Sequence, residues 1–165
     1  MSTAYRVRAC NAAGCGSYSA SKLVRRIIYD AQVLSHVAPD HMLSDEQATI
    51  TVTVRNSGNV AWPATGFYLG RNDGRYTMPA SIPLTAAVAP GATTTFRHTF
   101  VAPRGPVSPM PTYYFGGRMA GNGIGWFGQA APERSTRVEN PFGHCPGGGQ
   151  TCQSPYSLGV QGVAP

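Results

Sequence analysis

Alternating apolar and polar side chains run through most of this chain. The clearest case is the segment ATITVTVRN, where Ile50, Val52 and Val54 alternate with threonine and arginine. Successive side chains of a strand point to opposite faces, so this segment has one buried and one solvated face. No window shows the 3.6-residue period of an amphipathic helix. The pattern therefore predicts an all-β protein.

Further short strands are separated by turns rich in glycine, proline and asparagine. We expect them at residues 31–37, 66–70, 81–85, 93–101 and 135–139. Phe96, His98 and Phe100 share one face, and Pro83 indicates an edge strand. About seven strands of this kind predict an immunoglobulin-like β-sandwich over residues 30–140.

The stretch TYYFGGRMAGNGIGWF, residues 112–127, begins as a strand and breaks at three glycines before an aromatic pair. It predicts the last hairpin of the sandwich, with Trp126 and Phe127 closing one end of the core. Tyr114 lies on the face opposite its two aromatic neighbours, so we expect it to be exposed.

Residues 4–24 alternate on both sides of a turn at Asn11 to Gly14, which predicts a hairpin. Cys10 and Cys15 flank the turn, and a disulfide between them is preferred over two free thiols. The hairpin resembles the last two strands of a fibronectin type III domain. The matching residues are Tyr5, Val7, Ala9, Asn11, Gly14, Gly16 and Ser19. We therefore assign residues 1–24 to a fragment of such a domain and 25–29 to a linker.

Residues 141–165 are dominated by Gly, Pro, Ser and Gln and have no periodicity, which predicts a flexible tail or a linker. A disulfide between Cys145 and Cys152 is preferred over a metal site that would include His144, because zinc needs a fourth ligand. Four cysteines allow three connectivities, and spacing alone does not choose among them.

The net charge of +6 raises the question of nucleic-acid binding. Five of the 13 basic residues precede Asp30, the first acidic residue, and the others are scattered. A phosphate-binding surface clusters basic residues on one face, so we expect a solvated basic surface and no nucleic-acid partner. No apolar run reaches the length of a membrane span, and we expect no membrane insertion.

Residues 30–139 resemble the four-tryptophan immunoglobulin-like domain, especially its bacterial members. The matching elements, in chain order, are Asp30-Ala31-Gln32, the N-x-G-x-x-x-W pattern at Asn56, Gly58 and Trp62, Tyr68-Leu69-Gly70, Val88 to Gly91, Tyr113, Phe115, Arg118-Met119 and Gly125 to Gly128. Two of the four family tryptophans are present. Gly117 stands where a third is expected, and Tyr76 is the aromatic residue nearest to the position of the fourth.

The resemblance implies a module of a larger protein. Bacterial members occur among fibronectin-like modules of secreted or surface proteins, and eukaryotic members mediate protein–protein contacts in autophagy receptors. We therefore expect an extracellular or cell-surface location and contacts with neighbouring domains of the same parent chain. Residues 1–20 contain no apolar leader, so we expect a targeting signal upstream of this fragment.

No catalytic constellation is evident in the sequence. The seven carboxylates are dispersed, and no nucleophile elbow or phosphate-binding loop is present. His98 is interpreted as a hydrogen-bonded core histidine rather than a ligand or catalyst. We expect no enzyme activity, no cofactor and no metal.

The leading functional hypothesis is a non-catalytic spacer or protein-interaction module, and the alternative is a carbohydrate-binding accessory module. Gly116 and Gly117 should leave a hollow that is filled by Phe100 or Met119, or that opens as a shallow groove. The candidate ligand or partner surface comprises Trp62, Tyr68, Tyr76, Tyr114, Gly116, Gly117, Arg118, Trp126 and Phe127. For Trp62 and Trp126, a core position is the preferred interpretation.

Overall fold

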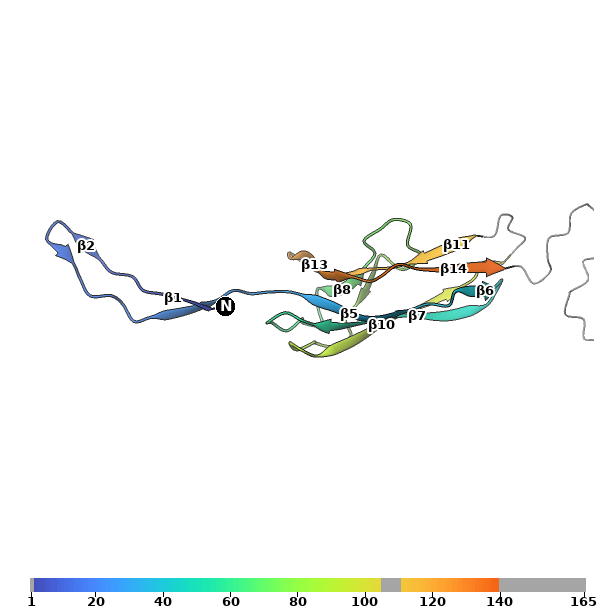
Figure 1. Ribbon diagram of the computed structural model, residues 1–165, viewed down its shortest axis with the longest axis horizontal. Helices are drawn as coiled ribbons and strands as arrows, with labels where there is room; N and C mark the ends of the chain where they lie inside the picture. Colours follow the sequence, from blue (N-terminus) through green and yellow to red (C-terminus); the bar gives the residue numbers. More distant parts are fainter. Residues whose placement is uncertain (1, 105–110, 140–165) are drawn as a thin grey trace, which may run out of the picture.

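A long two-stranded ribbon precedes the main body of the protein (Figure 1). The computed structural model describes residues 2–104 and 111–139. In the ribbon (residues 2–29), β1 (Ser2–Tyr5) pairs antiparallel with β4 (Lys22–Arg25). At its tip, β2 (Cys10–Asn11) pairs with β3 (Gly14–Cys15). The part of the chain that the structure describes is built of strands and turns, and it contains no helix that could cross a membrane.

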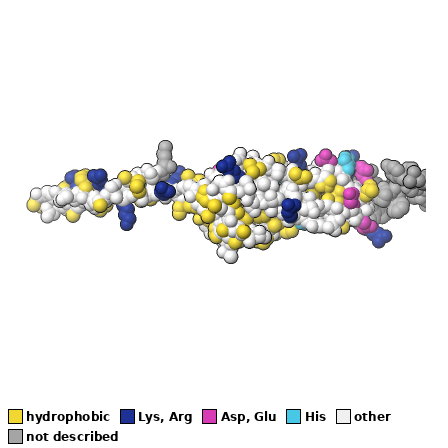
Figure 2. Space-filling view, turned by 90° about the horizontal axis from the view of Figure 1, so that it is seen from below, with side chains coloured by type: hydrophobic (Ala, Val, Ile, Leu, Met, Phe, Trp, Pro, Cys, Tyr) yellow, Lys and Arg dark blue, Asp and Glu magenta, His cyan; other side chains and the backbone are white. Residues whose placement is uncertain are grey.

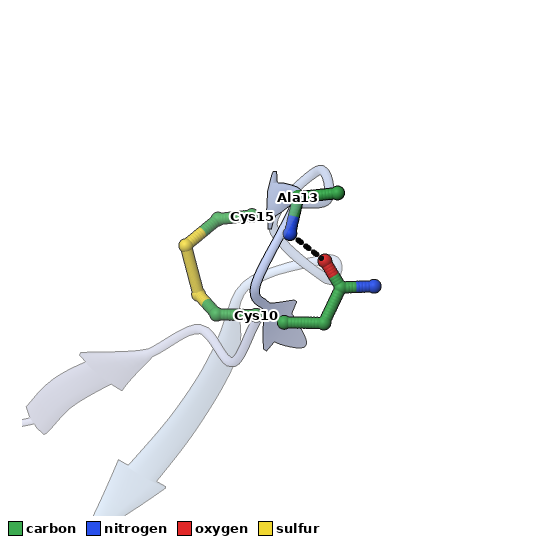
Figure 3. Close-up of a disulfide and its surroundings, with 4 residues drawn as sticks. Cys10, Ala13 and Cys15 are labelled. Atoms are coloured by element: carbon green, nitrogen blue, oxygen red, sulfur yellow. Dashed lines mark hydrogen bonds between the residues drawn. A yellow bond between two sulfur atoms is a disulfide. The ribbon is translucent and has the colours of Figure 1, made fainter.

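The predicted disulfide is present at the tip of the ribbon (Figure 3). Cys10 and Cys15 are directly opposite each other in the antiparallel ladder. The turn between them is stabilised by Asn11, whose side-chain Oδ1 accepts a hydrogen bond of 2.9 Å from the backbone N–H of Ala13. The preferred pairing of these two cysteines is therefore confirmed, whereas Cys145 and Cys152 lie outside the described residues.

The first layer of the body is a three-stranded antiparallel sheet. It comprises β5 (Ala31–Val37), β7 (Gln47–Asn56) and β10 (Thr93–Val101) in the order β10-β7-β5. In β7 the three alternating apolar residues, Ile50, Val52 and Val54, are buried as predicted. In β10 the buried Phe96 is opposite Val52, and the buried Phe100, opposite Ala48, lies on the same face.

The second layer faces the first across the core (Figure 1). It contains β8 (Phe67–Gly70), β9 (Ser81–Pro83), β12 (Arg118–Gly121) and β13 (Gly125–Ala130) in the order β13-β12-β8-β9. A further sheet has the order β11-β14-β6. Its strands are β6 (His41–Leu43), β11 (Thr112–Phe115) and β14 (Arg134–Glu139), and β14 runs parallel to β6.

Two apolar clusters fill the space between the layers. The larger one includes Trp62, Leu69 and Met119, and the smaller one includes Ile50 and Phe115. The predicted all-β sandwich is therefore confirmed. Burial also follows the strand period, because Phe67 and Leu69 are buried while the intervening side chain of β8 is half-exposed.

The two sides of the sandwich are closed differently. On one side, the side chain of Gln129 on β13 accepts a hydrogen bond of 3.1 Å from the backbone N–H of Val33 on β5. On the other side, the edge strands β9 and β10 flank an open groove of about 330 Å³, lined in part by Ile82 and Thr95. Pro83 lies on the edge strand β9, as the sequence predicted.

The body is more subdivided than predicted, with ten strands among the described residues of 30–139 instead of about seven. Part of the difference is β6, which is too short for a recognisable alternation. The other part is the stretch 112–127, which is not a single final hairpin. Gly116 and Gly117 interrupt it, so β11 pairs with β14 while β12 pairs with β13 and β8.

The segment that joins the ribbon to the body is anchored to the body. Asn59 accepts a hydrogen bond of 2.9 Å from the N–H of Ile28 through its Oδ1, and its Nδ2 donates to the carbonyl of Arg26 at 2.7 Å. The ring of Tyr29 packs with its centroid 5.5 Å from that of Phe67. Most of the predicted linker, residues 25–29, is thus in contact with the sandwich.

We predict that the position of an N-terminal truncation decides the stability of the sandwich. Removing residues 1–25 should leave its free energy of unfolding nearly unchanged. Removing residues 1–29 should lower the free energy of unfolding by about 2 kcal/mol, because the buried area of Tyr29 is lost. Denaturant unfolding of the two truncated proteins makes the comparison, and equal midpoints would contradict the anchoring role of residues 26–29.

Candidate functional site

An exposed aromatic surface lies on the outer face of the four-stranded sheet. Tyr68 on β8 is half-exposed, and Trp126 on β13 has 47% of its surface exposed. In the strand register both residues are opposite Ala120 of the central strand β12. Because directly paired residues share a face, the two aromatic side chains emerge on the same side of the sheet.

The indole of Trp126 lies across the sheet and over Gly70. A Cβ placed on Gly70 would be 2.6 Å from Cη2 of Trp126 and 3.1 Å from a ring carbon of Tyr68. The two rings therefore adjoin above this glycine, and any larger residue there would displace them. We call Tyr68, Gly70, Ala120 and Trp126 the aromatic platform.

Arg118 is the charged residue beside the aromatic platform. It pairs with Gly70 in the register and is half-buried. Its Nε donates a hydrogen bond of 2.9 Å to the carbonyl of Gly128, which fixes the guanidinium against the sheet. The strands β8, β9, β12 and β13 contain no other charged residue and no carboxylate. The face is therefore cationic as well as aromatic.

Five of the nine members of the predicted surface are buried, namely Trp62, Tyr76, Gly116, Gly117 and Phe127. Trp62 is fully buried, and its ring centroid is 5.6 Å from that of Phe127. The aromatic pair at the end of the stretch 112–127 is thus divided. Phe127 joins the core as expected, whereas Trp126 points outward instead of closing one end of it. The strand period separates the two neighbours.

Neighbouring groups occupy the positions where side chains of Gly116 and Gly117 would lie. The ring of Tyr76 lies directly against Gly116, and a Cβ on Gly117 would be 3.2 Å from a side-chain carbon of Leu69. The expectation that Phe100 or Met119 fills this space, or that it opens as a groove, is wrong. Tyr76 fills it from the loop after β8, and its side chain is 9% exposed.

Tyr114 is half-buried rather than exposed. Its ring lies beneath Arg75, whose guanidinium carbon is 5.2 Å from the ring centroid. Arg75 also forms ion pairs with Asp73 and Glu133, so it spans the loop after β8 and the segment before β14. The alternation correctly placed Tyr114 on the outer face, but it carries no information about this covering loop.

The structure brings two histidines to a small cavity that the sequence did not predict. His36 on β5 and His98 on β10 line a cavity of about 10 Å³, which is close to the volume that one water needs. The side chain of His36 is 5% exposed, its Nδ1 donates to the carbonyl of Pro132 at 2.7 Å, and its Nε2 has no partner among the described residues. Burial is the main cause that lowers the pKa of both histidines.

Residues 2–104 and 111–139 contain no cluster of three or more potential metal-ligating side chains. His144, Cys145 and Cys152 lie outside these ranges. His98 is half-buried between the two phenylalanines of β10, in agreement with a position on the inner face.

Comparison with known proteins gives no relative. No family model matches this sequence, and no curated protein matches it. The resemblance to four-tryptophan and fibronectin type III domains therefore stays a prediction that depends on the residues themselves.

The aromatic platform could have been found only in part from the sequence. Alternation in FYLG places Tyr68 and Gly70 on one face. The proximity of Trp126 to Tyr68 and Gly70 depends on the order of strands β8, β12 and β13, which no local sequence pattern encodes.

We predict that Gly116→Ala destabilises the protein by about 1–3 kcal/mol, because the added methyl group collides with the Tyr76 ring in a filled core. Gly74→Ala is the matched control, since its Cβ meets no atom within 4 Å and the change should be nearly neutral. Chemical denaturation measures both. In a Tyr76→Ala background the cost of Gly116→Ala should largely disappear, and an undiminished cost would contradict the contact.

We predict that the free energy of unfolding falls as the pH decreases below about 6.5, the usual pKa of histidine. The folded protein has a lowered pKa at His36, so the unfolded chain binds the proton first and is favoured. The contribution of His36 to the free energy of unfolding is complete above the pKa that it has in the unfolded chain. It is lost as the pH falls towards the lower pKa that it has in the folded protein. His36→Gln should flatten this part of the stability profile, and His98→Gln should flatten it partly. A slope unchanged in both variants would contradict the assignment.

Proposed function

We propose that this protein is a non-catalytic β-sandwich module, a spacer and protein-interaction domain of a larger secreted or cell-surface protein. The observation that carries the proposal is the ribbon, in which every residue from 2 to 28 is exposed. A two-stranded hairpin without a further layer is only marginally stable in water. The ribbon therefore gains stability by packing against another protein surface.

The exposed side chains of the ribbon supply the apolar part of such a contact. Val7 has 73% of its surface exposed and Leu23 has 69%. Complete burial of a side chain of this size contributes about 2 kcal/mol. The large apolar residues exposed in this segment are Tyr5, Val7, Tyr18, Leu23, Val24, Ile27 and Ile28.

Charge supports an oriented contact. The ribbon carries Lys and Arg but no acidic residue, and the Asp and Glu side chains visible in Figure 2 lie near the opposite end of the sandwich. A partner surface with complementary acidic groups would therefore be favoured at the ribbon. The neighbouring domains of the same parent chain are the proposed partners.

The disulfide supports an extracellular location. Disulfides persist in oxidising compartments and are rare in the reducing cytosol. The bond between Cys10 and Cys15 closes a short loop, which fixes the tip of a ribbon that has no core of its own. A fibronectin-like origin of this ribbon, and a four-tryptophan type for the sandwich, are part of the same proposal.

The carboxylates support a structural role for the polar residues. Asp45, Asp73 and Glu133 form ion pairs with arginine side chains, and a carboxylate oxygen of Glu139 lies 3.3 Å from Nδ1 of His41. Asp30 accepts a hydrogen bond from Ser57, and Glu46 accepts one from the backbone of Leu43. Six of the seven carboxylates in the chain are thus engaged in holding turns and loops.

Hydrogen–deuterium exchange tests this proposal. We predict rapid exchange in the ribbon of the isolated chain and strong protection of the same amides when the chain is extended by the preceding residues of its parent protein. Replacing Val7 and Leu23 by Thr should reduce that protection, whereas Thr3→Ser should leave it unchanged.

A ribbon that exchanges equally fast in the longer protein would refute the interaction role. A hydrolytic activity of the purified chain that is lost in His98→Ala would refute the non-catalytic role. The two measurements are independent, so each part of the proposal has its own test.

A further inference from the structure

The aromatic platform lies on the outer face of the four-stranded sheet, where Trp126 is exposed and Tyr68 is half-buried. Trp126 lies over Gly70, and the Tyr68 ring adjoins it there. The remaining neighbour within the platform is Ala120, which has no side chain long enough to rise above the rings. Trp126 therefore keeps 47% of its surface exposed to solvent.

The aromatic platform differs from a protein-binding hot spot because it lies on a sheet face, outside both the cavity beside His36 and the groove between β9 and β10. Residues that dominate protein interfaces cluster in well-packed pockets that exclude water. The small cavity and the groove between β9 and β10 are lined by other residues than the aromatic platform. An exposed aromatic ring on a sheet face instead fits a sugar ring, whose axial C–H bonds form an apolar face that packs against the negative π-face of an aromatic side chain.

Charge indicates which sugars fit. Arg118 lies in the row of residues beside the rings and is the single charged residue of the four strands. Its Nε is used by the Gly128 carbonyl, which leaves the guanidinium N–H groups at the two Nη atoms to donate to a ligand. No carboxylate on these strands repels an anion, and an arginine favours a planar carboxylate.

We propose that the aromatic platform and Arg118 form a binding site for an acidic polysaccharide of the polyuronate class. One or two pyranose rings stack on Trp126 and Tyr68, and a sugar carboxylate pairs with Arg118. This site lies on the sandwich and is separate from the ribbon, so it goes beyond the proposed interaction function and can fail independently of it.

Tryptophan fluorescence tests the stacking directly. The chain has two tryptophans, and since Trp62 is fully buried, quenching by the neutral quencher acrylamide reports mainly on Trp126. Polygalacturonate and polymannuronate oligomers should protect Trp126 from quenching, and neutral cello- and xylo-oligomers of the same length should protect it less. Protection that increases with protein concentration alone would assign this face to self-association and overturn the proposal.

Affinity electrophoresis in gels containing polygalacturonate or polymannuronate tests the residues. Trp126→Ala should weaken binding by about tenfold or more, Trp126→Phe should retain most of it, and Arg118→Gln should weaken binding to the acidic polymer. Ile124→Ala changes another exposed apolar residue of the same hairpin and should have no effect. Unchanged thermal midpoints establish that the variants are folded.

A non-specific attraction to a cationic protein is the competing explanation. Arg6→Gln with Arg8→Gln removes two charges from the ribbon and should leave the affinity nearly unchanged. The proposal is overturned if this variant loses as much affinity as Arg118→Gln. It is also overturned if Trp126→Ala binds normally, if no polyuronate binds, or if neutral chains bind equally well.

Discussion

A single buried amide side chain, Asn56, fixes the end of the sandwich where the ribbon enters. It is fully buried at the end of β7, and its Nδ2 donates hydrogen bonds of 2.9 Å to the carbonyls of Val60 and Val88. Its Oδ1 accepts from the N–H of Gly58 at 3.1 Å. An unsatisfied buried amide is costly, so these hydrogen bonds hold the loop after β7 in one conformation. The same loop leads to Trp62, whose backbone forms a bridge to Val88, so the position of Trp62 is fixed as well.

The same loop controls how the preceding chain joins the sandwich. A Cβ on Gly58 would lie 2.9 Å from the backbone nitrogen of Asp30 and still closer to the carbonyl of Ile28, so only glycine allows this approach. The neighbouring Asn59 then holds Arg26 and Ile28 through its side chain. The pattern N-x-G-x-x-x-W therefore has a physical explanation that does not depend on any ligand. The asparagine closes the loop, the glycine admits the incoming chain, and the tryptophan fills the core.

Prediction from sequence succeeded where local alternation decides the outcome and failed where distant segments meet. The buried face of β7, the pairing of Cys10 with Cys15 and the edge position of Pro83 all follow from short-range pattern and turn chemistry. The packing of Tyr76 against Gly116 does not, because a residue forty positions away supplies the missing volume.

The candidate site shows the same limit. Alternation separates Trp126 from Phe127, but only the pairing of β13, β12 and β8 brings the indole over Gly70. The environment of His36 could not be predicted either, because its Nδ1 bonds the carbonyl of Pro132, 96 positions away, and its Nε2 has no partner among the described residues.

The positions at which the chain enters and leaves the sandwich have a mechanical consequence. β5 begins at the end beside the ribbon, and β14 ends at the far side of the body (Figure 1). Tension applied between these two points therefore runs parallel to the strands. The hydrogen bonds of antiparallel ladders are perpendicular to the strands, so such a force loads many of them together in shear instead of opening them one at a time. With its two chain ends placed in this way, the sandwich resists extension by force better than its hydrophobic core alone would suggest.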